Sequence, residues 1–208
     1  MKKIVFVVDD DLSVREALSS LIRSVGLHVE AFASAKEFLL FRRPDAAACL
    51  VLDVRMPGLG GLELQRELSQ AGILIPIIFI TGHGDIPMTV RAMKAGAVDF
   101  LSKPFRDQEL LEAIFHSLEQ DSAVRHQRAE LAEIQDRFDR LTSREREVIA
   151  LIVRGMRNKQ AATELGITEV TVKVHRHNAM EKMGASSLPT LIGMVNRLRL
   201  SDDASNFT

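Results

Sequence analysis

The 208-residue chain carries a formal charge of −1, with 46% hydrophobic and 26% charged residues, proportions that are ordinary for a folded protein. This length suits two modest domains or one large one. The single cysteine, Cys49, excludes an intramolecular disulfide, and no apolar run approaches the length of a transmembrane helix. The short apolar run near the start ends in acidic residues, unlike a secretory signal, so we expect a cytoplasmic protein with no membrane partner.

The charge is unevenly distributed along the chain. Residues 1–122 contain 13 Lys and Arg against 17 Asp and Glu, whereas residues 140–200 contain 11 Lys and Arg against 5 Asp and Glu. An acidic first part and a basic second part indicate different partners, and nucleic acid is the leading candidate for the basic part.

The first 120 residues alternate short apolar runs, rich in Val, Ile and Phe, with segments that repeat apolar residues at helical spacing. Five strands alternating with five helices predict an α/β domain, in which a five-stranded parallel sheet has helices on both faces. The expected strands are residues 3–8, 28–32, 49–53, 75–80 and 98–102, and the expected helices are residues 12–26, 34–43, 60–72, 85–97 and 106–120.

Residues 121–140 contain no Gly or Pro and favour a helical linker that continues from the fifth helix. Apolar residues repeat along this segment at three- and four-residue spacing. We favour a solvated spacer, and a short coiled-coil contact between two chains is the alternative. The repeating residues are Leu131, Ile134, Phe138 and Leu141.

Residues 141–200 show a purely helical pattern and predict a small separate all-α domain. Gly155, Gly166 and Gly184 close three of its helical segments, and Pro189 lies in the first turn of the fourth. We expect the last residues, 201–208, to form a flexible tail. The four expected helices are residues 143–155, 158–165, 168–184 and 188–200.

Three adjacent carboxylates, Asp9, Asp10 and Asp11, follow the first expected strand. Like charges about 4 Å apart repel by ~1 kcal/mol in water and by ~4 kcal/mol near a protein surface, so this cluster calls for a counter-charge. Asp11 is a suitable N-cap for the helix that follows, which accounts for one carboxylate. Asp9 and Asp10 lie at the carboxyl end of a parallel strand, the edge where active crevices form in such sheets.

Polar residues also end three later strands: Asp53 in LVLDVRMPGLGG, Thr81 in FITGHGD and Lys103 in FLSKPF. Together with Asp9 and Asp10, they stand in the order and spacing of a known family. Residues 1–120 resemble the receiver domain of two-component response regulators. This resemblance implies a flavodoxin-like fold and a phosphoacceptor site at the carboxyl edge of the sheet.

The resemblance implies a chemical role for each pocket residue. Asp53 provides the oxygen nucleophile that accepts a phosphoryl group, and the dispersed charge of that group calls for Mg²⁺ or Mn²⁺. Asp10 and Asp53 are the expected side-chain ligands of the cation. Asp9, directly or through water, and the backbone carbonyl of Arg55 complete the set. Lys103 is expected to pair with the phosphoryl oxygens.

The resemblance also implies a switch. Thr81 is expected to donate its hydroxyl to the new phosphate while Phe100 moves inward, although Phe100 is alternatively a plain core aromatic. A phosphorylation-dependent homodimer is expected to use a face that includes Val90, Lys94 and Phe100, with a merely solvated face as the alternative.

Two further features of the pocket follow from the resemblance. The Lys103-Pro104 bond is expected to be cis, although the sequence alone favours trans. Arg55 and His83 flank the site at positions that tune hydrolysis of the aspartyl phosphate in the family. His83 is disfavoured as a metal ligand because an oxygen-rich site selects Mg²⁺.

A tight turn at Gly166 joins two helical segments in the basic part, and this arrangement presents a recognition helix to the major groove of DNA. Residues 141–200 resemble the helix-turn-helix domain of the FixJ/NarL group, also called the LuxR-type domain. The run Leu141-Thr142-x-Arg144-Glu145 and the core Thr171-Val172-Lys173-Val174-His175 carry this resemblance.

The recognition helix is expected to read bases through Lys173, which donates to guanine, and Val174, which meets a thymine methyl group. His177 lies one turn further and reaches a base or a phosphate. The residues expected to project outward are Thr171, Lys173, Val174 and His177, and those expected to pack inward are Ile167, Val170, Val172, Ala179 and Met183. The expected phosphate contacts are Asn158, Lys159 and Arg176.

These features predict a transcription factor that a sensor histidine kinase phosphorylates on Asp53, which then dimerises and binds promoter DNA. RNA polymerase is a further expected partner. The chain is not expected to be an enzyme beyond assisting its own Mg²⁺-dependent phosphotransfer and dephosphorylation. One alternative is a constitutive DNA-binding protein whose receiver is an unphosphorylated docking module. Another is a Mg²⁺-dependent phosphohydrolase, for which a second acid and a cap insertion are missing.

Overall fold

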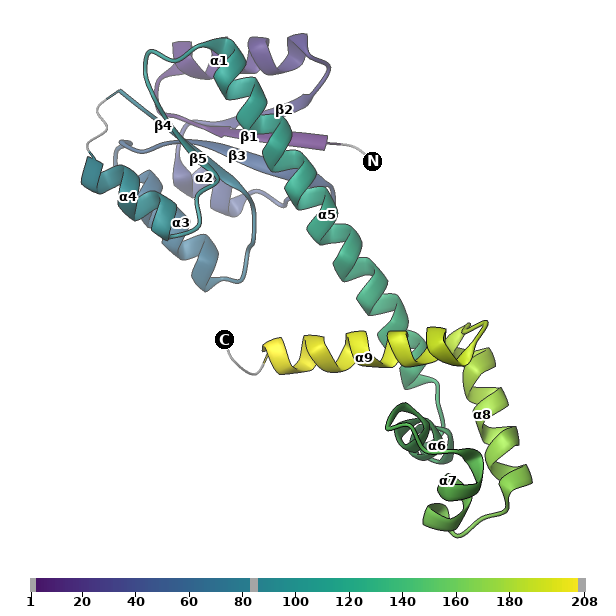
Figure 1. The fold of residues 1–208 in the computed structure, drawn as a ribbon. Helices are drawn as coiled ribbons and strands as arrows, with labels where there is room; N and C mark the ends of the chain where they lie inside the picture. The colour runs from purple at the N-terminus through teal and green to yellow at the C-terminus, as the bar shows by residue number, and fades with distance from the viewer. Residues whose placement is uncertain (1–2, 83–85, 206–208) are drawn as a thin grey trace. The chain divides into compact units, whose positions relative to one another are not determined.

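The computed structural model describes residues 3–82 and 86–205, and the chain divides into two compact units, residues 1–125 and 126–208 (Figure 1). Each unit has hydrophobic clusters of its own. No helix among the described residues is both long and apolar enough to cross a membrane.

The first unit contains the predicted five-stranded parallel sheet, and its strand order is β2-β1-β3-β4-β5. The chain reverses its direction of winding between β1 and β3, and in such sheets the crevice at this switch point is where ligands bind. Every residue of β3 is buried, because this strand lies at the centre. The strands are β1 (Lys3–Val8), β2 (His28–Phe32), β3 (Ala47–Asp53), β4 (Ile77–Thr81) and β5 (Asp99–Ser102).

Helices cover both faces of this sheet (Figure 1). Alternate residues of β1 point to opposite faces: Phe6 packs with α2, α3 and α4, whereas Val5 and Val7 pack with α1 and α5. The α/β prediction is therefore confirmed, including the layers. The helices are α1 (Leu12–Ser24), α2 (Ala35–Leu40), α3 (Gly61–Gln70), α4 (Ile86–Lys94) and α5 (Asp107–Asp139).

Two of the differences between observed and expected bounds lie beside proline residues. The expected helix over residues 34–43 ends at Leu40, because residues just before Pro44 are pushed away from helical backbone angles. The fourth strand begins at Ile77, after Pro76, which has no N–H to donate to the sheet.

The second unit adds four helices to the last part of α5. Thr142 and Glu145 form a reciprocal capping box at the start of α6, and Gly166 and Gly184 close α7 and α8 with left-handed backbone angles. These helices confirm the predicted all-α pattern. They are α6 (Ser143–Val153), α7 (Asn158–Leu165), α8 (Glu169–Met183) and α9 (Leu188–Ser205).

The expected flexible tail is partly helical. α9 continues to Ser205, so residues 201–205 extend this helix, and the flexibility expected of the tail stays a prediction. No Gly or Pro interrupts residues 194–205, and an established helix extends easily through such a segment. Residues 206–208 lie outside the described part of the chain.

The apolar repeat in the predicted linker is not a solvated spacer. Ile134 is buried and packs in the same cluster as Leu141 and Ile149, with Phe138 partly buried against it. The helical character of residues 121–139 is confirmed, but this apolar face serves the core of the second unit. Sequence spacing alone does not reveal which surface such a face covers.

Candidate functional site

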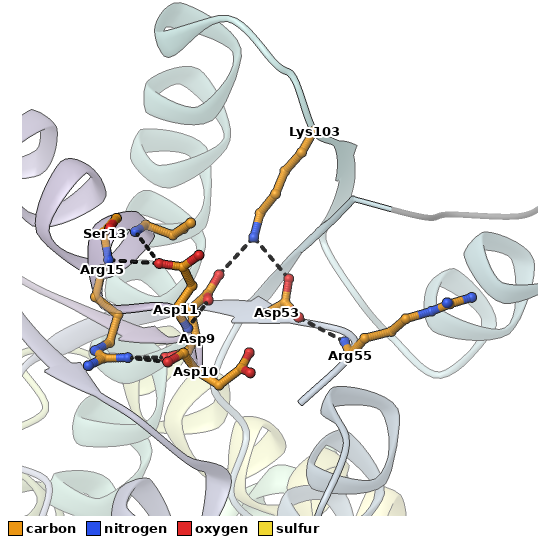
Figure 2. A network of polar contacts seen from close by, with 9 residues as sticks. Asp9, Asp10, Asp11, Ser13, Arg15, Asp53, Arg55 and Lys103 are labelled. Carbon is orange, nitrogen blue, oxygen red and sulfur yellow. Dashed lines mark hydrogen bonds and ion pairs between the residues drawn. The ribbon is translucent and has the colours of Figure 1, made fainter. Parts of the chain in front are cut away.

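The acidic pocket lies at the carboxyl edge of the sheet, where β1, β3 and β5 end (Figure 2). Asp9 and Asp53 are only 1% and 6% exposed. The ammonium of Lys103 donates to Asp9 Oδ2 at 2.8 Å and to Asp53 Oδ1 at 3.0 Å. The chain itself therefore supplies one counter-charge to the carboxylates, through a residue distant from both in sequence.

Burial and charge act against each other on these groups. Burial raises the pKa of Asp53 above its ordinary value, although the hydrogen bond and charge of Lys103 partly oppose this. Burial lowers the pKa of Lys103, but its hydrogen bonds to Asp9 and Asp53 outweigh that effect and the pKa is raised. Lys103 is therefore charged at neutral pH.

The loop between β1 and α1 is held by hydrogen bonds to its backbone. Asp11 caps α1 as predicted, since its Oδ1 accepts from two N–H groups of the first turn. Arg15 Nη1 donates to the carbonyl oxygens of Asp9 and Asp10 at 2.8 and 2.9 Å, as Figure 2 shows. The sequence prediction missed Arg15, whose only signal is a basic residue one turn beyond the cap.

The backbone around Asp53 packs closely against the start of α3. Asp53 Oδ2 accepts a hydrogen bond from the N–H of Arg55 at 2.9 Å, while the Arg55 residue itself is exposed. A Cβ on Gly61 would lie 2.4 Å from the carbonyl oxygen of Asp53. Only glycine fits at this contact. The sequence prediction also missed Gly61, because a sequence does not show which atoms a glycine approaches.

The remaining pocket predictions concern Thr81, Phe100, the Lys103-Pro104 bond and His83. Thr81 is buried at the end of β4, and Phe100 is half-buried with its ring 6.2 Å from that of Phe79. The Lys103-Pro104 bond is cis, as predicted. His83 lies outside the described residues, and the switch roles of Thr81 and Phe100 stay predictions.

The expected dimer face has the exposure that such a role requires. Val90 and Lys94 are exposed on α4, and Phe100 is half-buried on the neighbouring β5. Two further apolar residues of α4, Ile86 and Met93, are exposed as well. The use of this face in a dimer stays a prediction.

The pocket has the donor chemistry of a divalent-cation site. Asp9, Asp10 and Asp53 offer carboxylate oxygens at one edge of the sheet, and hard cations such as Mg²⁺ prefer oxygen ligands. Among the described residues, no three carboxylate, imidazole or thiol side chains are already gathered as a ligand set. Lys103 bridges Asp9 and Asp53, and Asp10 is exposed beside them. These residues fit such a cation chemically.

The second unit presents the turn and the recognition helix in the predicted arrangement. Val172, Ala179 and Met183 are buried, as expected for the inner face of α8. Val170 is 69% exposed, so its predicted inward packing is wrong. Because it precedes Val172 by two residues, about 200° around the helix, it lies on the opposite face.

The predicted phosphate contacts are not equally available. Arg176 Nη1 donates to Asn158 Oδ1 at 3.2 Å, which joins α8 to the start of α7. Lys159 is exposed near the start of α7, and Lys173 forms an exposed ion pair with Glu169 at 3.1 Å. The DNA contacts of all these residues stay predictions, with Asn158 and Arg176 holding each other.

Comparison with known proteins matches both units. Residues 5–115 match the response regulator receiver domain, and residues 139–195 match the family described as bacterial regulatory proteins, luxR family. Nodulation protein W of Bradyrhizobium diazoefficiens is 56% identical over 96% of this chain and 88% of the relative. Transcriptional regulatory protein FixJ of Azorhizobium caulinodans is 46% identical over 91% of this chain and 90% of the relative.

A solved structure is also similar along nearly the full length. The structure of the response regulator StyR aligns with a TM-score of 0.88 and 54% identity, covering 95% of this chain and all of that chain. The described fold of the first unit and the helical second unit agree with these matches. The chain therefore belongs to the response regulators and combines a receiver domain with a LuxR-type DNA-binding domain.

Proposed function

We propose that this response regulator is a transcription factor controlled by phosphorylation of Asp53, with a sensor histidine kinase as the phosphoryl donor. One observation carries this proposal: the Asp53 carboxylate is buried at the switch point of the sheet and bonded to Lys103. A purely structural ion pair between Lys103 and Asp53 does not need the carboxylates of Asp9 and Asp10 beside it. A phosphoacceptor site needs these carboxylates to bind a divalent cation.

The transfer uses groups that the chain provides. An oxygen of Asp53 attacks the phosphorus of a phosphohistidine, the P–N bond breaks, and its electron pair stays on the imidazole nitrogen. The phosphoryl group then carries charge that Lys103 neutralises from its place beside Asp53. Because Lys103 also bonds to Asp9, the new phosphoryl oxygens compete with Asp9 for the same ammonium.

Asp10 and Asp53, with Asp9 directly or through water, would hold Mg²⁺ or Mn²⁺, which would supply the remaining neutralisation of charge. The backbone carbonyl of Arg55 would be the further ligand. Two observations support this set. Arg15 holds the carbonyls of Asp9 and Asp10, which fixes the loop that bears both carboxylates. The N–H of Arg55 bonds to Asp53, which keeps the two ends of that turn together.

Phosphorylation acts on DNA binding through the face of the receiver. The Thr81 hydroxyl binds the phosphoryl group, Phe100 moves inward, and the face with Val90 and Lys94 pairs with a second copy. Two recognition helices, one from each copy, then bind promoter half-sites about one helical turn apart. The DNA-bound dimer acts with RNA polymerase. The exposed apolar side chains of α4 support a face that becomes buried on association.

The test is the intact mass of the protein after incubation with a small phosphoramidate donor and Mg²⁺. We expect one added phosphoryl group in the unmodified protein and none in Asp53→Asn. Asp45→Asn is the matched control, because the Asp45 side chain is almost fully exposed and outside the pocket. No phosphoryl gain in the unmodified, folded protein would contradict the proposal and favour a receiver that acts as a docking module.

A further inference from the structure

The recognition helix α8 exposes a stripe of four side chains. Val170, Lys173, Val174 and His177 follow one another at spacings that place them on one helical face, and all four are exposed. Val170 is 69% and Val174 51% exposed. Among the described side chains of the second unit, these two are the only large hydrophobic ones with such exposure.

Exposure of these two valines has no explanation in the packing of the second unit. The inner face of α8 is filled by Val172, Ala179 and Met183, which point away from the stripe. Burying a valine side chain is favourable, so two valines left in water on one helix forgo a stabilising contribution. An external apolar partner of the same size would recover it.

We propose that Val170 reads DNA sequence, and that Val170 and Val174 together contact two thymine methyl groups in the major groove. This inference rests on the proposed DNA-binding function and deepens it. The C5 methyl of thymine is the apolar group that a base pair presents in the major groove. Val170 lies in the first turn of the recognition helix, and N-terminal residues of such helices contact base edges.

The surroundings of the pair favour DNA over a protein partner. Lys173 lies between the two valines on the same face, and the exposed Arg157 and Lys159 stand at the start of α7. Lys173 also pairs with Glu169 on the same helix, and the exposed cationic side chains of the two helices suit phosphates that flank the bases. A stable protein interface buries about 800 Å² on each partner, far more than two valine side chains provide. Two separate valine side chains on one helical face suit small apolar groups such as thymine methyls.

The experiment pairs removal of a methyl group from the DNA with truncation of the valine. Duplexes that bind the phosphorylated full-length chain are selected from random sequence, and each thymine of the enriched half-site is replaced in turn by deoxyuridine. Dissociation constants are measured for the unmodified chain, Val170→Ala and Val174→Ala. Removal of one contacted methyl is expected to weaken binding about fourfold.

The quantity that tests the proposal is the loss of affinity on removing each thymine methyl, compared between the unmodified chain and each valine variant. One thymine is expected to lose its methyl effect in Val170→Ala, and a different one in Val174→Ala. Val124→Ala, which truncates an exposed valine on α5, is the control and should keep every methyl effect. If Val170→Ala responds to every deoxyuridine as the unmodified chain does, or if no thymine is enriched, Val170 does not read DNA. Failure to enrich any sequence contradicts the DNA-binding function itself.

Discussion

The acidic pocket and the recognition face build function in opposite ways. The pocket joins Lys103 to Asp9 and Asp53 across 94 and 50 residues of chain, and both carboxylates are buried. The stripe on α8 places four exposed side chains within eight residues of one helix. A change in the pocket therefore alters both chemistry and folding stability, whereas a change on the stripe alters recognition alone.

The largest expected effect comes from removing the Lys103 ammonium group from the pocket. Lys103→Ala leaves two buried carboxylates without their common partner, so without Mg²⁺ we expect the free energy of unfolding to fall by about 3 kcal/mol. Mg²⁺ should recover part of this loss, because it replaces the missing positive charge. Urea unfolding followed by circular dichroism, with and without Mg²⁺, measures both effects.

Lys94→Ala is the control for that change, since Lys94 is an exposed lysine of the same unit. Its effect on stability should stay within about 0.5 kcal/mol. Equal stability of Lys103→Ala and Lys94→Ala would mean that the ion pairs of the pocket contribute nothing to folding, and the contrast with the exposed stripe would not hold.

The next effect tests how closely α3 packs against the phosphoacceptor. Gly61→Ala forces a Cβ against the Asp53 carbonyl, so we expect a loss of about 2–3 kcal/mol and slower phosphorylation. Gly60→Ala is the matched control, because its Cβ would meet the nearest backbone atom at an ordinary 3.5 Å. Thermal unfolding and intact-mass phosphorylation rates compare the two variants. Similar behaviour of both would show that the backbone near Asp53 yields easily.

On the recognition side, two lysines should separate specificity from general affinity. Lys173→Ala is expected to weaken binding to the selected duplex about tenfold and to scrambled DNA far less. Lys159→Ala should weaken both alike and reduce the salt dependence by about one phosphate contact. Dissociation constants at several salt concentrations measure this. If both variants lose affinity equally on both duplexes, the division between base and phosphate contacts is wrong.

The smallest expected effect concerns a buried ion pair in the DNA-binding unit. Burial raises the pKa of Glu145, but hydrogen bonds from Lys182 and Thr142 outweigh it and the pKa lies below its ordinary value. The stabilisation is therefore complete above the unfolded pKa of about 4.3 and is lost as the pH falls through the lowered folded pKa.

Glu145→Gln should accordingly cost about 1 kcal/mol at pH 7, and its difference from the unmodified chain should shrink as the pH falls below about 4. Urea unfolding over a pH series gives this difference. Glu147→Gln, which alters the exposed pair with Arg144, should have little effect at any pH. A difference for Glu145→Gln that does not change with pH would assign its cost to packing.

Local sequence patterns were sufficient to predict the order of the elements and the identity of the main pocket residues. Asp11 as a helix cap and Gly166 as the closing residue of α7 are local signals, because they depend on backbone angles and hydrogen bonds within a few residues. The polar ends of β1, β3 and β5 were predictable because parallel strands bring their carboxyl ends to one edge.

The partners of these residues depend on the three-dimensional arrangement of the elements. Lys103 reaching Asp9, Arg15 holding two carbonyls and Gly61 touching Asp53 all depend on how strands and helices are placed side by side. Local patterns carry no information on such distances. The same reason explains one wrong prediction, because Ile134 packs in the core of its own unit. The outward position of Val170 follows instead from helical periodicity, which places it about 200° from the buried Val172.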